Sequence, residues 1–407
     1  TRSCLVSWGS EMCIRDRTMI SLLPQARASG TKLISNGGGV NPRAAAQRVA
    51  EGARRAGLAG SRIALVEGDD MLEKLDDLMR QGVPLRNMDT GDENFAAIRD
   101  RVVCANVYTD SSGIIEGLEG EADVVIAGRV SDNALYVGPL AHEFGWRRDA
   151  AHIDRYAAAV TLGHIVECAA GCSGGMSSRF ADMPHMGRAG FPILEVAPDA
   201  EAVVTKLSGT GGRVDQWTIK EHLVYEVGNP RRYLMPDAVA DFTSLRLADE
   251  GQDRVRVSGV RGEAAPDLWK LVVGYQDGWI GETMAFFPWP YAYDRAVKAR
   301  ETMLERFERM GLAADEIHFD FVGLNTLHGP AAAFPGREQA NELPEVGLRC
   351  AVRTRTAEEA DKARRAGTNL WIMGPGGTSF GTPMKPRPVI SLWPTLIPRA
   401  AVEQKTE

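Results

Sequence analysis

An arginine and an aspartate stand three positions apart in the turn that follows a short apolar run. The run is Val124–Ala127, and the turn contains Arg129, Ser131 and Asp132. An arginine can hold a carboxylate or a phosphate, and an aspartate can move a proton. Arg129 and Asp132 are therefore candidate catalytic residues, and Ser131 is a candidate anion-binding residue. The alternative is a purely structural turn, in which Ser131 or Asp132 caps the next helix.

A histidine and a glutamate form a second candidate pair. The apolar pattern predicts a helix over residues 153–170, on which His164 and Glu167 are three residues apart and are therefore neighbours. Together they can act as a general acid or base beside the flexible loop that contains Gly174 and Gly175. We count His164 and Glu167 as candidate catalytic residues and the two glycines as candidate substrate contacts. The alternative is that Glu167 only orients a buried histidine.

Three consecutive glycines precede a predicted helix. They are Gly37, Gly38 and Gly39, and Asn36 and Asn41 flank them. Bare backbone amides at the positive end of a helix can bind an anion, so all five residues are candidate anion-binding residues. The spacing matches neither a dinucleotide fingerprint nor a Walker motif. A tight turn that needs a positive φ is the alternative. Asn41 is also a good N-cap for the predicted helix, with Pro42 as its first residue.

Two further turns supply candidate anion contacts. One follows a predicted strand, and the other precedes a helix predicted over residues 214–226, whose positive N-terminus is expected to be open to an anion. The residues are Asp110 and Ser111 in the first turn and Thr210, Gly211 and Gly212 in the second.

These turns are positioned by strands that alternate with helices. The strands are short apolar runs, predicted over residues 32–36, 62–67, 102–108 and 124–127. Their alternation with helical patterns predicts an α/β fold with a right-handed, doubly wound parallel sheet. Because the carboxyl ends of parallel strands meet at one edge of a sheet, the side chains that follow the strands are expected to share a ligand crevice.

The second half of the chain is richer in strand patterns. Strands are predicted over 241–247 and 254–260, joined by a hairpin loop, and over 268–275, 282–287, 317–322 and 347–353, with a long helix over 293–310. We predict a parallel α/β domain over residues 18–175 and a second, α+β domain over residues 176–399. A Gly/Pro-rich closing loop ends the second domain, and residues 400–407 form a tail.

Composition excludes several classes of function. The chain has 407 residues, of which 44% are hydrophobic and 25% charged, with a formal net charge of −7. A net acidic chain without basic runs argues against a nucleic-acid partner, and no apolar stretch is long enough to span a bilayer. The six cysteines lack metal-binding spacing. No cofactor motif is present, but Mg²⁺ needs only one or two carboxylates and stays an alternative. We expect a cytoplasmic homo-oligomer that binds a small molecule.

Six motifs that occur in order resemble the acyclic terpene utilisation AtuA family. They lie within Lys32–Arg399 and are Asn36–Pro42, Gly128–Asp132, Gly163–Cys168, Gly209–Gly212, Tyr233–Asp237 and Ser391–Pro394. The resemblance implies a role in the bacterial breakdown of citronellol and geraniol through branched acyl-CoA intermediates. It implies a pathway rather than one reaction.

The chain departs from the family pattern at both ends. Residues 1–17 show no periodicity and are expected to be a non-native leader. The family begins with a further strand and glycine-rich turn, and longer relatives carry a ferredoxin-like domain after the region that matches Leu396. We therefore expect an N-terminally truncated or mis-called short form with an exposed sheet edge.

The residues and the resemblance together predict a catabolic enzyme that acts on a small carboxylate or a branched acyl-CoA. The expected step is of the lyase or hydratase type and uses no metal. Glycine-turn amides and Arg129 would hold the anion, while Asp132, His164 or Glu167 moves a proton. The competing hypothesis is a non-catalytic subunit or scaffold that binds a partner enzyme such as an acyl-CoA carboxylase.

Overall fold

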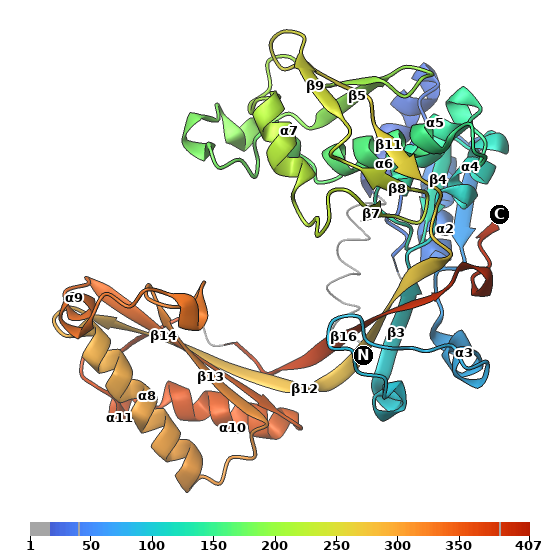
Figure 1. Cartoon of the computed structure of the whole chain (residues 1–407). Helices are drawn as coiled ribbons and strands as arrows, with labels where there is room; N and C mark the ends of the chain where they lie inside the picture. The colour runs from blue at the N-terminus through green and yellow to red at the C-terminus, as the bar shows by residue number, and fades with distance from the viewer. Residues whose placement is uncertain (1–16, 40, 382–383) are drawn as a thin grey trace. The chain divides into compact units, whose positions relative to one another are not determined.

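The computed structural model describes residues 17–39, 41–381 and 384–407 (Figure 1). Contacts between residues group the chain into two compact units. Unit 1 contains the described residues up to Phe95, together with Cys104–Val273 and Pro394–Glu407, and unit 2 contains Ala96–Val103 and Gly274–Trp393. Residue 175, where the sequence pattern changes, lies inside unit 1. The expected leader lies outside the described residues except for Arg17, which begins a helix over residues 17–29.

Unit 1 contains a mostly parallel sheet with the strand order β1-β4-β2-β17. Its strands are β1 Leu33–Ser35, β2 Ile63–Glu67, β4 Val124–Ala127 and β17 Lys405–Thr406. β1 and β2 pair with β4 in parallel on its two sides, and β17 lies antiparallel to β2. The expected α/β fold is therefore confirmed.

Helices cover both faces of this sheet. They are the helix over residues 17–29, α2 Pro42–Arg55, α4 Ser112–Glu119 and α5 Ala134–Phe144. The short helix α3 Leu75–Arg80 lies in the segment between β2 and β3. α2 and the first helix share an apolar cluster with Val124 and Ile126 of β4, whereas α4 and the start of α5 share one with Val125 and Ala127. Because successive side chains of a strand point to opposite faces, β4 must be apolar at every position.

The strand expected over residues 102–108 does not belong to the parallel sheet. It forms β3 (Val102–Val107) and pairs with β12 (Leu268–Pro288) instead, and Tyr108 N donates to the Lys270 carbonyl. Most β3 residues are only partly buried, unlike those of β4, so β3 is not covered on both faces. Its end still reaches the parallel sheet, because Thr109 forms a parallel bridge with Val130.

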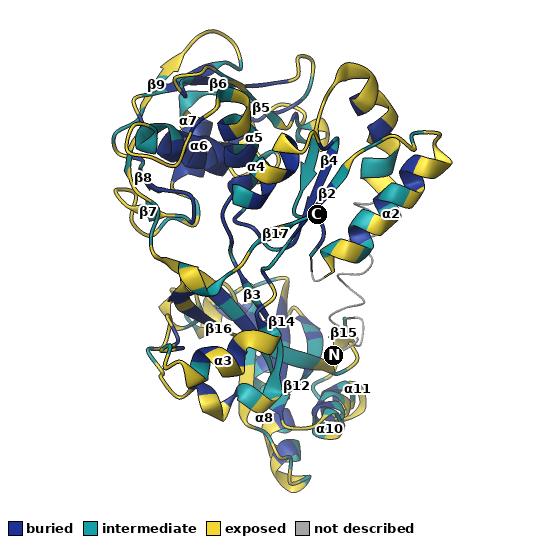
Figure 2. Ribbon diagram, turned by 90° about the vertical axis from the view of Figure 1, so that its right-hand side faces the viewer, coloured by how far each residue is buried: buried dark blue, intermediate teal, exposed yellow. Residues whose placement is uncertain are grey.

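The largest apolar cluster of unit 1 surrounds helix α6 (Ile153–Val166). Every residue from Tyr156 to Val166 is buried, and Figure 2 shows this helix in dark blue. α5 and α7 (Gln216–Leu223) contribute to the same cluster. Both predicted helices are longer than the observed ones: α6 ends at Val166, and α7 begins after Asp215, which caps it.

Two small antiparallel sheets complete unit 1. Their orders are β5-β6-β10-β9 and β11-β8-β7. The strands are β5 Pro192–Val196, β6 Ala202–Lys206, β7 Tyr233–Leu234, β8 Val239–Asp241, β9 Arg246–Asp249, β10 Val255–Ser258 and β11 Arg261–Glu263. A hairpin was expected where the chain turns into the strand predicted over residues 254–260, and the antiparallel pairing of β9 with β10 confirms it. The predicted strand over residues 241–247 is wrong, because that range spans the turn between β8 and β9.

Unit 2 is built on a sheet in which β12 pairs antiparallel with β14 and β15, and β14 pairs antiparallel with β13. β16 and β3 also pair with β12. The further strands are β13 Glu316–Val322, β14 Glu345–Thr354, β15 Ser379–Phe380 and β16 Arg387–Pro398, and the helices are α8 Ala292–Arg309, α9 Arg337–Asn341, α10 Ala357–Thr368 and α11 Leu370–Met373. α8 and α10 pack on the sheet through Met303, Leu348 and Ala363. The two strands predicted over residues 268–275 and 282–287 are one strand, because β12 continues between them, with Gly278 at φ 97°. Such a glycine marks a local irregularity of a strand rather than its end.

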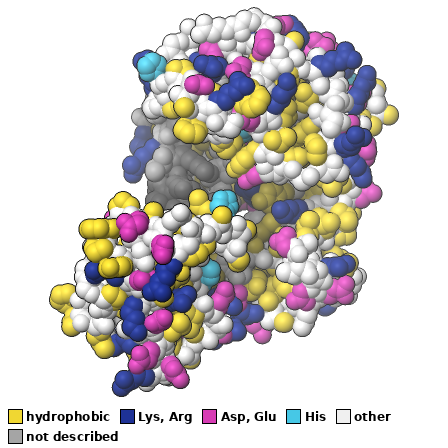
Figure 3. All heavy atoms as spheres, turned by 60° about the vertical axis from the view of Figure 1, so that its left-hand side comes forward, with side chains coloured by type: hydrophobic (Ala, Val, Ile, Leu, Met, Phe, Trp, Pro, Cys, Tyr) yellow, Lys and Arg dark blue, Asp and Glu magenta, His cyan; other side chains and the backbone are white. Residues whose placement is uncertain are grey.

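The surface carries charges of both signs. Figure 3 shows Lys and Arg side chains interspersed with Asp and Glu over the face that it displays. That face therefore offers no continuous basic surface to a polyanion. In the described ranges, no helix combines the length and the apolar character that crossing a membrane requires.

Candidate functional site

Four turns from distant parts of the sequence meet at the carboxyl edge of the parallel sheet. Asn36, after β1, donates its amide to Asp132 Oδ1 at 3.0 Å. Asp69, after β2, accepts a hydrogen bond from the Arg129 backbone at 2.8 Å. The turn after β3 joins them through the bridge between Thr109 and Val130. The convergence expected from the strand order is therefore present in the fold.

The Arg129 side chain lies at this edge with part of its guanidinium open to solvent. The guanidinium lies over the Tyr108 ring at 4.2 Å from the ring centre, and Nη2 is 3.6 Å from Asp132 Oδ2. The side chain is 34% exposed. An aromatic ring and a carboxylate orient the cation without enclosing it, so its remaining donors can reach a ligand anion.

Asp69 fixes the backbone from which Arg129 projects. It is 5% exposed and accepts the Arg129 N–H and the Asn106 amide, the latter at 2.9 Å. Burial raises the pKa of Asp69, and the two donors oppose that rise. Gly128 is required beside it, because a Cβ there would be 2.1 Å from Asp69 Oδ1. In the sequence, Asp69 is one of several polar residues that follow strands, and nothing in the pattern marks it as the residue that holds the Arg129 backbone.

Asp132 is not a helix cap, and neither is Ser131. α5 begins after Asn133, which makes no side-chain capping bond, and the Asp132 carboxylate faces Asn36 and Arg129 instead. The prediction of a cap at Ser131 or Asp132 is wrong: the Asp132 carboxylate instead pairs with Arg129 of the same turn and accepts the amide of Asn36, which comes from a distant turn that local sequence does not reveal. Ser131 Oγ and the Asn133 amide are buried, and neither has a hydrogen-bond partner among the described residues.

The amides of the triple glycine are engaged inside the protein. Gly37 N donates to Ser35 Oγ at 2.9 Å, Gly38 N to the Ala127 carbonyl at 3.2 Å, and Gly39 N to the Asn36 carbonyl at 3.3 Å. A Cβ on Gly38 would be 2.6 Å from the Ala127 carbonyl, and Gly39 has φ 52°. These contacts favour the tight turn over the anion site.

The Asn41 side chain caps a helix and is therefore not free to bind an anion. It accepts the Ala44 N–H at 2.9 Å and begins α2, with Pro42 in the first turn. The cap expected from the sequence is therefore confirmed.

The later glycine turns also use their amides internally. Gly211 N donates to the Arg188 carbonyl and Gly212 N to the Pro184 carbonyl, while Thr210 N donates to the Leu207 carbonyl. Gly174 N and Gly175 N donate to the Gly171 and Ala170 carbonyls. The N-terminus of α7 is closed by Asp215, which accepts both the Trp217 and the Thr218 amides. The expected open N-terminus after Gly212 is therefore wrong.

His164 lies in the core beneath the carboxyl edge. It is 1% exposed, and Nε2 is 3.1 Å from the His222 carbonyl, which can only accept. Nδ1 faces Glu167 Oε1 at 3.1 Å and the Tyr233 hydroxyl at 3.4 Å. Glu167 is partly exposed, at 13% of its side chain. Glu167, rather than His164, is therefore the member of this pair that a ligand can reach.

His222 returns the contact and stays neutral. Its Nε2 donates to the His164 carbonyl at 2.9 Å, and its Nδ1 is buried with no partner in the described part of the chain. Burial, reinforced by His164, lowers the pKa of His222 to about 4. A neutral imidazole with its proton on Nε2 satisfies this geometry.

Two tyrosines connect the pair to Asp132. Burial raises the pKa of Tyr136 to about 12, and the nearby charges of Glu167 and Asp132 add to the rise. The same three causes raise the pKa of Tyr233. The geometry agrees: the Tyr136 hydroxyl donates to the Val166 carbonyl at 3.3 Å, and the Tyr233 hydroxyl lies 3.4 Å from His164 Nδ1. A Cβ on Gly163 of α6 would be 2.7 Å from the Cβ of Asn133, the residue after Asp132. The structure thus brings Arg129, Asp132, Glu167 and His164 into one region of unit 1.

Asp110 and Ser111 belong to a buried charge network. Asp110 accepts Arg399 Nη2 at 2.6 Å and lies 3.4 Å from Arg148 Nη2. Arg148 also donates to Asp237 at 2.6 Å, and Ser111 donates its hydroxyl to the same carboxylate. Burial raises the pKa of Asp237, which Arg148 opposes. Asp110 is therefore held by cations and is not itself an anion contact.

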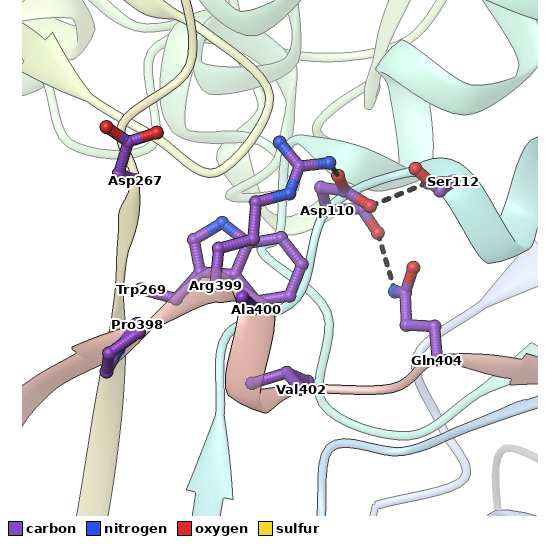
Figure 4. A pocket seen from close by; sticks show the side chains of 9 residues that line it. All are labelled: Asp110, Ser112, Asp267, Trp269, Pro398, Arg399, Ala400, Val402 and Gln404. Atoms are coloured by element: carbon purple, nitrogen blue, oxygen red, sulfur yellow. Dashed lines mark hydrogen bonds and ion pairs between the residues drawn. The ribbon is translucent and has the colours of Figure 1, made fainter. Parts of the chain in front are cut away.

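Two cavities flank this network. One, of about 660 Å³, is lined by Asp110, Trp269, Arg399 and Gln404 among others (Figure 4), and the second, of about 300 Å³, contains Arg148, Asp237 and again Arg399. Arg148 and Arg399 gave no local signal in the sequence. Asp237 stood only at the end of the motif Tyr233–Asp237.

Among the described residues, no group of three or more His, Cys, Asp or Glu side chains is arranged so that it could hold a metal ion.

Comparison with known proteins identifies the family of the chain. The family model described as acyclic terpene utilisation family protein AtuA matches residues 14–407. No curated protein and no solved structure matches the chain.

Proposed function

Because this chain belongs to the acyclic terpene utilisation AtuA family, we propose that it is a catabolic enzyme acting on a small carboxylate or a branched acyl-CoA derivative. The step is of the lyase or hydratase type. The reaction class rests on the acid–base groups of the site, since the family description names a pathway and not a reaction. We also propose that the enzyme is a cytoplasmic homo-oligomer.

The position of Arg129 supports this proposal most directly. The residue lies at the carboxyl edge of the parallel sheet, where open α/β folds bind their ligands. Its guanidinium is partly exposed and stands beside a carboxylate that is also accessible, since the Asp132 side chain is 46% exposed. A cation that can hold an anion therefore lies beside a group that can take a proton.

Each residue has a distinct role in the proposed reaction. Arg129 binds the carboxylate or thioester oxygen of the ligand, where developing negative charge gains from a fixed cation. Asp132 removes a proton from the adjacent carbon, and the Asn36 amide orients the carboxylate that does so. Glu167 is the second proton-transfer group, and His164, which is enclosed, positions it.

The glycine turns have a different role from the one expected. Since their amides bond within the chain, we assign them to shaping the turns and not to holding the anion. A step assisted by Mg²⁺ is the alternative to this metal-free step, because one or two carboxylates suffice to bind Mg²⁺.

A thermal-shift screen tests the proposal. Short and branched acyl-CoAs, their free carboxylates and Mg²⁺ are each added to the protein, because a bound ligand raises the melting temperature. We expect a shift for at least one acyl-CoA or carboxylate, lost in Arg129→Ala. Arg254→Ala is the matched control, because Arg254 is a partly exposed arginine paired with Glu195 elsewhere in unit 1. A shift retained by Arg129→Ala contradicts the proposed anion contact.

Exposed apolar side chains favour the second candidate function, a non-catalytic subunit. Phe180, Phe191 and Leu207 are 78%, 66% and 65% exposed. Phe191 and Leu207 flank the paired positions Pro192 and Lys206, so they lie at one end of the β5–β6 hairpin. Exposed apolar patches mark protein interfaces. A subunit of this kind would lose partner binding in Phe191→Ser and would keep it in Arg129→Ala.

A further inference from the structure

The 660 Å³ cavity of unit 1 contains a buried donor without an acceptor. The indole nitrogen of Trp269 is enclosed and has no hydrogen-bond partner among the described residues. Trp269 is 4% exposed, so solvent does not satisfy it either. An enclosed N–H without an acceptor is costly and calls for a physical explanation. An indole N–H can only donate, so the missing group is an acceptor.

A cation with free donors lies over the same ring. The Arg399 guanidinium is 5.0 Å from the centre of the Trp269 ring, and in Figure 4 it crosses the ring toward Asp110. Only its Nη2 is bonded, to Asp110, so Nε and Nη1 have no partner in the described part of the chain. The side chain is 37% exposed. An unpaired neutral donor and a partly free cation therefore lie at the same ring, and a ligand in the cavity reaches the enclosed donor only when the Arg399 side chain moves.

Two acidic side chains line the cavity, Asp110 and Asp267, and Asp110 is not available to a ligand. Asp110 Oδ1 accepts the Ser112 N–H at 2.9 Å, and Oδ2 is shared by Arg399 and Arg148. Its carbonyl accepts the Gln404 amide at 3.0 Å. Asp110 is already saturated, and in Figure 4 the Asp267 carboxylate points away from the Trp269 ring, so the unpaired groups beside that ring are hydrogen-bond donors.

The apolar side chains of the wall, apart from Trp269, come from one segment. They belong to Pro398, Ala400 and Val402, and the following residues Lys405–Thr406 form β17 on the edge of the parallel sheet. A ligand in the cavity would therefore contact the C-terminal segment directly. The volume is that of an ordinary small-molecule pocket.

We propose that this cavity binds a small carboxylate with a short apolar body, at a site separate from Arg129. One carboxylate oxygen accepts the Trp269 N–H, and the other pairs with Arg399, whose side chain shifts from the ring edge to admit it. The apolar body lies against Pro398, Ala400 and Val402. Occupancy holds the C-terminal segment in place.

Calorimetric titration with sodium 3-methylbutanoate tests this site. We expect binding by the unmodified protein and by Arg129→Ala, binding about tenfold weaker for the uncharged 3-methylbutanamide, and a loss of about five- to tenfold in Trp269→Phe, which keeps the ring and removes the donor. Trp217→Phe is the matched control, since Trp217 also lies under an arginine, Arg179 at 4.0 Å. Hydrogen exchange in residues 398–406 should slow when 3-methylbutanoate binds.

A second variant, which fills the cavity with a larger side chain, tests the site even if Trp269→Phe is unstable. Ala400 is exposed at the cavity wall, so Ala400→Trp should abolish binding with little change in melting temperature. The proposal is overturned if 3-methylbutanoate does not bind, in which case a water molecule satisfies the indole, or if Trp269→Phe and Ala400→Trp bind as well as the unmodified protein. Because Arg129→Ala leaves this site intact, failure here is distinguishable from failure of the proposed reaction site.

Discussion

Replacing His222 with glutamine removes one buried titratable group and keeps a donor for the His164 carbonyl. His222 Nε2 makes that bond at 2.9 Å, and the glutamine amide nitrogen can replace it. Burial lowers the pKa of His222 from 6.5 to about 4. Since one pKa unit corresponds to 1.36 kcal/mol, the full effect on the free energy of unfolding is about 3 kcal/mol.

The sign of the effect follows from which state binds the proton first. The unfolded histidine takes up a proton as the pH falls below 6.5, whereas the folded one stays neutral until about pH 4. The stabilising contribution is therefore complete above pH 6.5 and is lost as the pH falls toward 4. Between pH 7 and pH 5, linkage predicts a loss of about 2 kcal/mol from this group.

Urea unfolding followed by circular dichroism at pH 7, 6 and 5 measures this loss. The free energy of unfolding should fall by about 2 kcal/mol more in the unmodified protein than in His222→Gln over that range. His142→Gln, at an exposed histidine of α5, should follow the unmodified protein. Parallel pH profiles for the unmodified protein and His222→Gln would refute the neutral, enclosed His222.

Three further substitutions test the packing that supports the site. Gly128→Ala places a Cβ 2.1 Å from Asp69 Oδ1 and should lower the free energy of unfolding by about 1–3 kcal/mol in urea titrations, whereas Gly60→Ala, where a Cβ meets nothing within 4 Å, should not. Asn41→Ala removes the cap of α2 and should destabilise the protein by about 1 kcal/mol in the same titration, a value near zero ruling out the cap. Asp237→Ala leaves Arg148 without its closest partner in the buried network and should lower the free energy of unfolding by about 3–5 kcal/mol, so an unchanged melting curve would contradict that network.

Local sequence predicted the elements that local physics determines. β4 was predicted over its observed residues because it must be apolar on both faces, and the Asn41 cap followed from the residue types at a helix start. The convergence of Asn36, Arg129 and Asp132 followed from strand order, because parallel strands end at one edge.

Long-range pairing explains what the sequence did not show. β3 has the same apolar strand pattern as β2 and β4, yet it pairs with β12, which lies more than a hundred residues later in the sequence. The residue types of β3 do not indicate which strand it pairs with. The contact between Asp110 and Arg399 joins positions 289 residues apart. Glycine turns were ambiguous for a different reason: the same residue types serve a tight turn and an anion site, and only the partners of their amides distinguish the two.

Proton exchange with solvent tests the central claim most directly. A carboxylate or acyl-CoA that binds in the thermal-shift screen is incubated with the protein in D₂O, and deuterium at the carbon next to the carbonyl is followed by NMR. We expect the unmodified protein to incorporate deuterium and Asp132→Asn to bind the same ligand without incorporating it. Incorporation by Asp132→Asn at the unmodified rate would contradict the assignment of Asp132 as the group that moves the proton beside Arg129.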